Sequence, residues 1–271
     1  MGERRRVVVT PTRKLNQKQA AALSFVIAFV IVSVLYTIQE IQRRKEDLAY
    51  PHGEIRIAVD AGYYPFTVYT DDGLEGIDID IGMALGEELG LQVRFVPMSV
   101  DGLYDSLAND QVDIIISALV VTYVRTEDVR YTRPYFDSGL VLVSPKDALI
   151  AEMESLPGHS LAYEFGSNAD TEARTWQQAI EAYETQPYEL PPYALDAVRL
   201  GVADAALVDA VDAHLYLRDH PQWQAEINYV THVQYVIAVR FDRNNTFNAT
   251  EKALSKLMRQ GIIEQILKRW L

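Results

Sequence analysis

Hydrophobic and polar positions change their spacing repeatedly after residue 53. Stretches with alternating or continuous apolar residues are typical of strands, and stretches with an apolar residue every three or four positions are typical of helices. The two kinds alternate along the chain, which predicts an α/β fold. The predicted strands cover residues 54–59, 91–98, 113–118, 139–144, 161–165, 205–209 and 235–240, and the predicted helices cover 79–89, 103–108, 170–182, 194–200, 211–217, 246–260 and 262–270.

A continuous apolar stretch precedes this body. Residues 20–38 form an uncharged run of nineteen residues, which at helical rise spans roughly 28 Å, close to the thickness of a bilayer core. We predict one transmembrane helix here, between a basic N-terminal segment (1–19) and a polar stalk (39–53). Lys and Arg are more numerous before the run than after it, which predicts a cytoplasmic N-terminus and an extracytoplasmic body.

The alternative is a secretory signal that is removed. Such signals have an apolar stretch of about 7–15 residues followed by a cleavage site made of small residues. The sequence after Ile38 instead continues QEIQRRKEDLAY. We therefore expect the helix to be retained as a signal anchor in the cell membrane, while its cleavage stays the open alternative.

Charge is unevenly distributed along the chain. Residues 1–50 carry nine Lys and Arg against four Asp and Glu, and the rest carries 16 against 34, a net charge of −18. An acidic body disfavours binding to nucleic acid. The chain has no cysteine, and its five histidines lack the spacing of metal ligands. We therefore expect no disulfide, no metal site and no cofactor.

Several segments carry motifs in a specific order. They are GIDIDIGMALGEELG (76–90), DIIISALVVTYVRTEDVRYTRPYFDSGLVLV (113–143), LGVADAALVDAVDAHLYL (200–217), YVIAVR (235–240) and a terminal helix that ends in KRW (268–270). In this order they resemble the family 3 extracellular solute-binding proteins, which bind polar amino acids for ABC importers. The resemblance covers residues 54–271.

This resemblance implies the two-lobed periplasmic-binding-protein type II fold. Two α/β lobes are joined by two crossover strands and close around the ligand by a hinge motion. Lobe 1 is expected to comprise residues 54–140 and, through the return crossover and the C-terminal helices, 233–271. Lobe 2 is expected to comprise 141–232. The crossovers are expected near Val141–Ser144 and His232–Ala238.

Two charged residues match positions that hold the amino-acid backbone in that family. Arg125 matches the carboxylate-binding arginine, whose planar guanidinium can pair with both carboxylate oxygens. Asp209 matches the carboxylate that accepts hydrogen bonds from the ligand's ammonium group. Each has a structural alternative, because Arg125 can pair on the surface with Glu127 or Asp128, and Asp209 can cap the following helix.

Other residues match the family's ligand contacts less specifically. We expect Tyr63 to stack on the ligand's side chain and Asp60 to accept from its polar or cationic end. Ser167 and Asn168 precede a helix, where backbone N–H groups can receive an anion or the side chains can simply cap the helix. Glu164 adds negative charge if strand alternation turns it toward the cleft.

Two expected contacts depart from the family pattern. Val100 stands where the family usually has a second aromatic residue, and Val120 where it usually has a hydroxyl, so one stacking face and one hydrogen bond are missing. Ala118, in the same segment as Val120, completes the set of expected ligand contacts. The departures predict a modest affinity or a ligand of different shape.

These residues predict a protein that binds an amino acid and delivers it to an ABC permease, without catalysis. One cation, Arg125, faces three carboxylates in the expected cleft, which favours a basic or amide-type ligand. Two other functions stay open. One is a cyclohexadienyl dehydratase-like enzyme on the same fold, with Glu164 as its candidate acid. The other is a ligand-sensing adaptor for a membrane partner.

Overall fold

The computed structural model describes residues 25, 27–37 and 48–271, in two compact units, Met1–Leu48 and Ala49–Leu271. Residues 27–37 of the first unit are helical, and their large apolar side chains are exposed. No helix in the described part of the chain has both the length and the apolar character that a membrane span requires. The predicted segment 1–19 lies outside the described residues, and the predicted span (20–38) and stalk (39–53) lie partly outside them.

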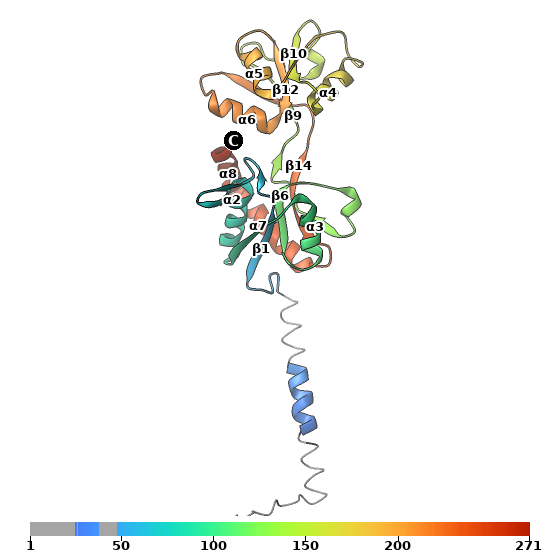
Figure 1. The fold of residues 1–271 in the computed structure, drawn as a ribbon, viewed down its shortest axis with the longest axis vertical. Helices are drawn as coiled ribbons and strands as arrows, with labels where there is room; N and C mark the ends of the chain where they lie inside the picture. The colour runs from blue at the N-terminus through green and yellow to red at the C-terminus, as the bar shows by residue number, and fades with distance from the viewer. Residues whose placement is uncertain (1–24, 26, 38–47) are drawn as a thin grey trace, which may run out of the picture. The chain divides into compact units, whose positions relative to one another are not determined.

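The second unit consists of two α/β lobes, each built on its own sheet (Figure 1). The sheet of the first lobe has the order β5-β1-β6-β14-β7, with β8 also paired to β14. Strands β5, β1 and β6 are parallel, and β14 is antiparallel to β6. The strands are β1 (Glu54–Val59), β5 (Gln92–Pro97), β6 (Ile114–Val120), β7 (Val129–Tyr131), β8 (Phe136–Asp137) and β14 (Gln234–Arg240).

Helices from both ends of this unit pack on the first lobe. They are α2 (Ile77–Leu89), α3 (Val100–Ala108), α7 (Asn244–Arg259) and α8 (Ile262–Trp270), with a 3-10 turn, η1 (Tyr123–Arg125), after β6. Helix α2 contacts both α7 and α8, so the end of the chain returns to the first lobe. A small sheet precedes α2 and contains β2 (Gly62–Tyr63), β3 (Thr67–Thr70) and β4 (Gly73–Glu75).

The sheet of the second lobe has the order β11-β10-β12-β9-β13. Strand β10 is parallel to β11 and β12, whereas β9 is antiparallel to β12 and β13. The strands are β9 (Leu140–Pro145), β10 (Ser160–Glu164), β11 (Glu184–Tyr188), β12 (Ala205–Asp209) and β13 (Ala225–Tyr229). The helical elements are η2 (Met153–Ser155), α4 (Asn168–Trp176), α5 (Pro191–Arg199) and α6 (Ala210–Asp219).

Strand β1 shows how an alternating sequence can be buried on both faces. Its residues from Ile55 to Val59 are all buried, including Arg56. The Arg56 guanidinium donates to both oxygens of Asp113, at 3.1 and 2.8 Å. A buried charge is tolerated when it is paired and hydrogen-bonded. The polar position therefore does not mark a solvent face, and β1 occupies the interior of the sheet.

The two crossovers lie a few residues before the predicted positions. Residues 141–144 lie inside β9 and pair with β12 or β13, and residues 234–238 lie inside β14, whereas residues 232–233 of the predicted return crossover do lie in the connection. The chain instead leaves the first sheet after β8, at Ser138–Gly139, and returns at Val230–Val233. The apolar stretches form buried strands, and the short segments before them make the connections.

The two crossovers are hydrogen-bonded to each other. The Asp137 carboxylate accepts from the Val233 backbone N–H at 3.0 Å and lies 2.5 Å from Nδ1 of His232. The backbone N–H of Ser138 donates to the carbonyl of Val233 at 2.8 Å. These contacts hold the two connections side by side.

We predict that Gly139→Ala destabilises the protein. Gly139 is buried, and a Cβ there would lie 1.8 Å from the carbonyl oxygen of Thr231 on the other crossover. One crossover must shift, and overpacking of this kind typically costs about 1–3 kcal/mol. Urea denaturation of residues 49–271 measures the change in the free energy of unfolding.

Gly102→Ala in α3 is the matched control. Its Cβ would meet Met98 at an ordinary 3.7 Å, and alanine is favoured over glycine inside a helix by roughly 0.5–1 kcal/mol. We therefore expect no loss of stability. Equal stability of Gly139→Ala and the wild type would contradict the close contact between the crossovers.

Candidate functional site

The carboxyl ends of β10 and β12 in the second lobe meet at a cavity. Ligands in open α/β sheets bind at this edge. The cavity has a volume of about 150 Å³. Its lining consists of Leu140, Glu164, Ser167, Asn168, Ala169, Pro191, Leu207, Val208, Asp209 and Asp212. Four predicted ligand contacts, at positions 164, 167, 168 and 209, therefore lie together.

Asp209 combines a capping role with a place in the cavity. It ends β12 and is the N-cap of α6, and one carboxylate oxygen, Oδ1, accepts from the Val211 N–H at 2.9 Å. The same oxygen accepts from the Ser138 hydroxyl at 3.1 Å. Burial raises the pKa of Asp209, although these two hydrogen bonds oppose the rise. The capping alternative is thus observed, and it also fixes the direction of the side chain in the cavity.

Asp212 is a cavity residue that the sequence analysis missed. It lies three positions after Asp209, and residues with this spacing share one face of a helix. Burial, together with the charges of Asp209 and Glu164, raises the pKa of Asp212 to about 6. The Asp-x-x-Asp spacing was the available signal. The site therefore holds three carboxylates on one lobe.

The Asp170 carboxylate lies at the N-terminus of α4, where a ligand anion was one of the two alternatives. Ser167 caps the helix by accepting from the Asp170 N–H at 3.3 Å. Asp170 in turn accepts from the Gly166 N–H at 2.9 Å, and a hydrogen bond from Arg174 lowers the pKa of Asp170. The capping alternative for Ser167 is thus observed. A ligand anion at this helix start would have to compete with the Asp170 carboxylate.

Tyr63, in β2 of the first lobe, senses the charges of this cavity. Its ring stacks on Phe66 at a centroid distance of 5.2 Å, and its hydroxyl lies 3.2 Å from that of Tyr235. Burial and the hydrogen bond to Tyr235 raise the pKa of Tyr63, and the charges of Asp209 and Asp212 raise it further. Tyr63 is therefore within electrostatic reach of the second lobe's carboxylates, and its ring is 42% exposed.

The other predicted contacts of the first lobe lie at or beyond strand ends. Asp60 follows β1, and its backbone N–H donates to the Ser117 hydroxyl at 2.9 Å. Val120 ends β6, and Val100 begins α3 just after β5. Both valine side chains are exposed. None of the three residues lines the cavity that contains Asp209.

Ala118 is held in a constrained conformation. Its φ of 45° lies in the left-handed region, which non-glycine residues rarely adopt. Its backbone N–H donates to Asp78 at 2.9 Å, and Asp78 accepts a second hydrogen bond from the Tyr135 hydroxyl at 2.6 Å. Burial raises the pKa of Asp78 to about 7. Asp78 and Tyr135 therefore position the end of β6.

Arg125 lies in a different cavity, on the first lobe. The exposed guanidinium carbon is 4.7 Å from the centre of the Tyr104 ring. The cavity has a volume of about 490 Å³ and is lined, among others, by Asp105, Glu127 and Asp128. No ion pair joins Arg125 to Glu127 or Asp128 in the described part of the chain. The carboxylate-binding role of Arg125 stays a prediction.

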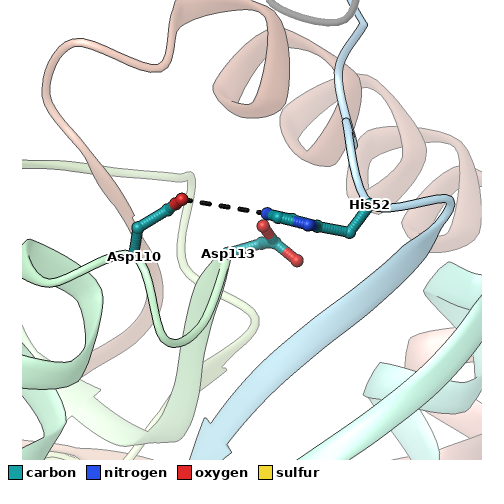
Figure 2. Close-up of side chains that lie close together, drawn as sticks. All are labelled: His52, Asp110 and Asp113. Carbon is teal, nitrogen blue, oxygen red and sulfur yellow. Dashed lines mark ion pairs between the residues drawn. The ribbon is translucent and has the colours of Figure 1, made fainter.

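A group of potential metal ligands lies elsewhere in the first lobe. His52, Asp110 and Asp113 each offer an atom within 4.8 Å of the others (Figure 2). Arg56 pairs with both aspartates, and Arg243 approaches Asp110 at 3.3 Å. Guanidinium groups on the same oxygens oppose a divalent cation. We interpret the group as a structural ion-pair cluster.

Comparisons with known proteins agree with this architecture. The family described as "Bacterial extracellular solute-binding proteins, family 3" matches residues 55–271. The ABC transporter arginine-binding protein 1 of Escherichia coli (strain K12) is 26% identical over 223 residues, which cover 80% of this chain and 90% of that protein.

Two solved structures extend the comparison. The L-cystine solute receptor of Neisseria gonorrhoeae, in its unliganded open conformation, has a TM-score of 0.71 at 22% identity, covering 85% of this chain and 95% of that one. An ancestral cationic amino acid solute-binding protein has a TM-score of 0.59 at 27% identity, covering 86% and 99%. The first likeness, at its low identity, shows the fold.

We predict that Asp212→Asn stabilises the unliganded protein at neutral pH. The folded-state pKa of Asp212, about 6, lies above its ordinary value of 3.8. The wild type therefore loses stability as pH rises from about 4 to about 6, because folding then opposes release of this proton. An uncharged Asn does not incur that loss. Since Asp212 is half-buried, we expect a difference on the order of 1 kcal/mol.

Urea denaturation of residues 49–271 at pH 4 and pH 7 measures this effect. The variant should match the wild type at pH 4 and exceed it at pH 7. The comparison between the two proteins cancels the contribution of every titrating group that does not interact with Asp212. A difference that does not change with pH would contradict the raised pKa of Asp212.

Proposed function

Because the chain belongs to the bacterial extracellular solute-binding proteins of family 3, we propose that it binds an amino acid and delivers it to an ABC permease. The observation that supports the proposal is the cavity at the carboxyl ends of β10 and β12, which Asp209 lines. Tyr63, on the other lobe, is within electrostatic reach of that carboxylate. A ligand bound there would be enclosed when the lobes close.

The charges of the site favour a basic or amide-type amino acid. Asp209 would accept from the ligand's ammonium group, and Asp60 of the first lobe would receive a cationic or amide end. An acidic side chain would set like charges together, which is unfavourable when they are desolvated. The names of two similar proteins, an arginine-binding protein and a cationic amino acid binding protein, support this choice.

In this proposal Arg125 binds the ligand's carboxylate after a change in the position of its side chain. To reach the ligand's carboxylate, its guanidinium must leave the ring of Tyr104, over which it lies at 4.7 Å. A cation–π contact at an exposed site contributes about 0.5–1 kcal/mol. A bidentate, desolvated pair with a carboxylate offers more than that. Ligand binding can therefore draw Arg125 from the lobe-1 cavity.

No catalytic step is part of the proposal. The family consists of solute-binding proteins, and the acid that a dehydratase would need, Glu164, shares its cavity with Asp209 and Asp212. Three carboxylates there serve the binding of a cation. A ligand-sensing role would use the same cavity and would differ in the membrane partner.

We also propose that residues 20–38 anchor the protein in the cell membrane, with a cytoplasmic N-terminus and an extracytoplasmic body. The uncharged run and the basic residues before it support this orientation. The exposed apolar side chains on the helical residues 27–37 also support an apolar environment for them. The anchor would keep the binding protein beside its permease.

We predict that arginine, lysine, histidine or glutamine binds more tightly than glutamate or aspartate. Isothermal titration calorimetry of the full-length protein should give a dissociation constant in the micromolar range, about −8 kcal/mol. The exposed Val100 and Val120 lack the stacking face and hydroxyl that would raise the affinity. Tight binding of glutamate would contradict the proposed ligand class.

We predict that Arg125→Ala weakens the preferred amino acid by about 2–5 kcal/mol, because a desolvated carboxylate loses its charged partner. Calorimetry measures the loss. The control is Arg259→Ala, which removes an exposed positive charge at the end of α7 and should change nothing. Unchanged affinity in Arg125→Ala would show that another group binds the carboxylate.

We predict that the full-length protein sediments with the membrane fraction and that residues 49–271 do not. Detergent, but not high salt or carbonate at high pH, should release the full-length protein, because burial of an apolar helix does not depend on surface charge. Release by salt alone would indicate a peripheral attachment and would remove the proposed anchor.

A further inference from the structure

We propose that Asp212 is a specificity-determining residue that selects ligands with two cationic groups, one held by Asp209 and the second held between Asp212 and Glu164. This inference rests on the proposed function, because it assumes that the ligand occupies the cavity of the second lobe. It differs from the role proposed above for Asp60, because it places the group that receives the second cation on the second lobe, at a residue that the family resemblance did not supply.

All three carboxylates line one small cavity. Asp209 ends β12, Asp212 lies in the first turn of α6, and Glu164 ends β10. All three line the cavity of about 150 Å³. A water molecule occupies about 30 Å³ in the liquid, so the cavity has room for a short chain of heavy atoms. Both ends of such a chain would meet a carboxylate.

No cationic side chain of the cavity lining neutralises this group, because the lining contains no Lys, Arg or His. Asp209 receives hydrogen bonds from Val211 and Ser138 on one oxygen, whereas the side chains of Asp212 and Glu164 make no hydrogen bond or ion pair with any residue that the structure describes. A ligand with one ammonium group would leave two carboxylates facing each other. A ligand with two cationic groups would neutralise more of the negative charge that lines the cavity.

The spacing of the carboxylates favours an elongated organic cation over a metal ion. Among the described residues, the group whose ligand atoms all lie within 4.8 Å of one another is His52, Asp110 and Asp113. Glu164, Asp209 and Asp212 do not form such a group. One ion cannot contact all three, whereas a chain with a charge at each end can. Dibasic amino acids and diamines both have a cationic group at each end of a chain, and they are the ligands that this arrangement fits.

The experiment uses calorimetry on the full-length protein with lysine, norleucine and cadaverine. Norleucine has the lysine chain without its terminal ammonium group, and cadaverine has both cationic groups without the carboxylate. We expect lysine to bind at least tenfold more tightly than norleucine. Asp212→Asn should reduce that advantage to threefold or less, and Asp212→Glu should retain most of it.

Asp147→Asn is the matched control. It makes the same charge change on an exposed residue in the turn after β9, and it should leave the advantage of lysine intact. Glutamine binding, measured for each variant, reports whether the site is still folded. Cadaverine that binds as tightly as lysine would support the inference and identify a diamine as the source of the same chemistry.

Other outcomes overturn the inference in distinguishable ways. If Asp212→Asn preserves the full advantage of lysine over norleucine, Asp212 is not the selector. If glutamine binds and lysine binds no better than norleucine, the inference fails while the proposed function stands. If none of these ligands and no other amino acid binds the wild type, both fail together.

Discussion

The contact between the two crossovers is the constraint on which the rest of the site depends. Gly139 can lie against the Thr231 carbonyl because it has no side chain. Ser138, which precedes Gly139, donates its backbone N–H to the Val233 carbonyl on the other crossover and its hydroxyl to Asp209. The connection between the lobes and the carboxylate of the cavity are therefore neighbours in sequence and in space. A shift in either crossover would also displace the partner of Asp209.

Two carboxylates of the cavity, Asp209 and Asp212, lower the stability of the unliganded protein at neutral pH. Burial and mutual repulsion raise the pKa of Asp212 and burial raises that of Asp209, so both are less easily ionised in the folded chain than in the unfolded one. Asp113, by contrast, is paired on both oxygens with Arg56. The same residue type thus stabilises the fold where a guanidinium pairs with it and lowers stability where no cation does. Unfavourable interactions of this kind concentrate at functional sites.

The sequence predicted the fold well because its buried strands are short apolar runs with distinctive motifs between them. The family resemblance is confirmed by the match over residues 55–271. It could not reveal β11 and β13, whose residues are largely polar and only partly buried. It placed the crossovers near residues 141–144 and 232–238, a few residues after the connections at 138–139 and 230–233, because a family motif does not show where strand pairing begins.

The candidate site was predicted in part for a related reason. Asp209 and Glu164 end strands whose direction fixes the face on which they emerge, so the topology alone brings them together. Asp212 was missed because a helical acid usually faces solvent, and only the packing of α6 against the sheet turns it inward. Arg125 lies on an exposed turn, η1, where strand pairing does not restrict the side chain. Its contact with Tyr104 depends on a helix distant in sequence.

The proposed site also bears on which state of the lobes a ligand would favour. A ligand shifts the equilibrium between open and closed lobes only through a difference in its affinity for the two. Closure removes water, and the repulsion among Asp209, Asp212 and Glu164 grows as the effective dielectric constant falls. When a cation lies between the carboxylates, closure becomes favourable, because the attraction between the cation and the carboxylates also grows as the dielectric constant falls. An acidic ligand has no such effect on this lobe. Selectivity and closure would therefore have one electrostatic origin, in which the groups that reject a wrong ligand also keep the unoccupied site from closing.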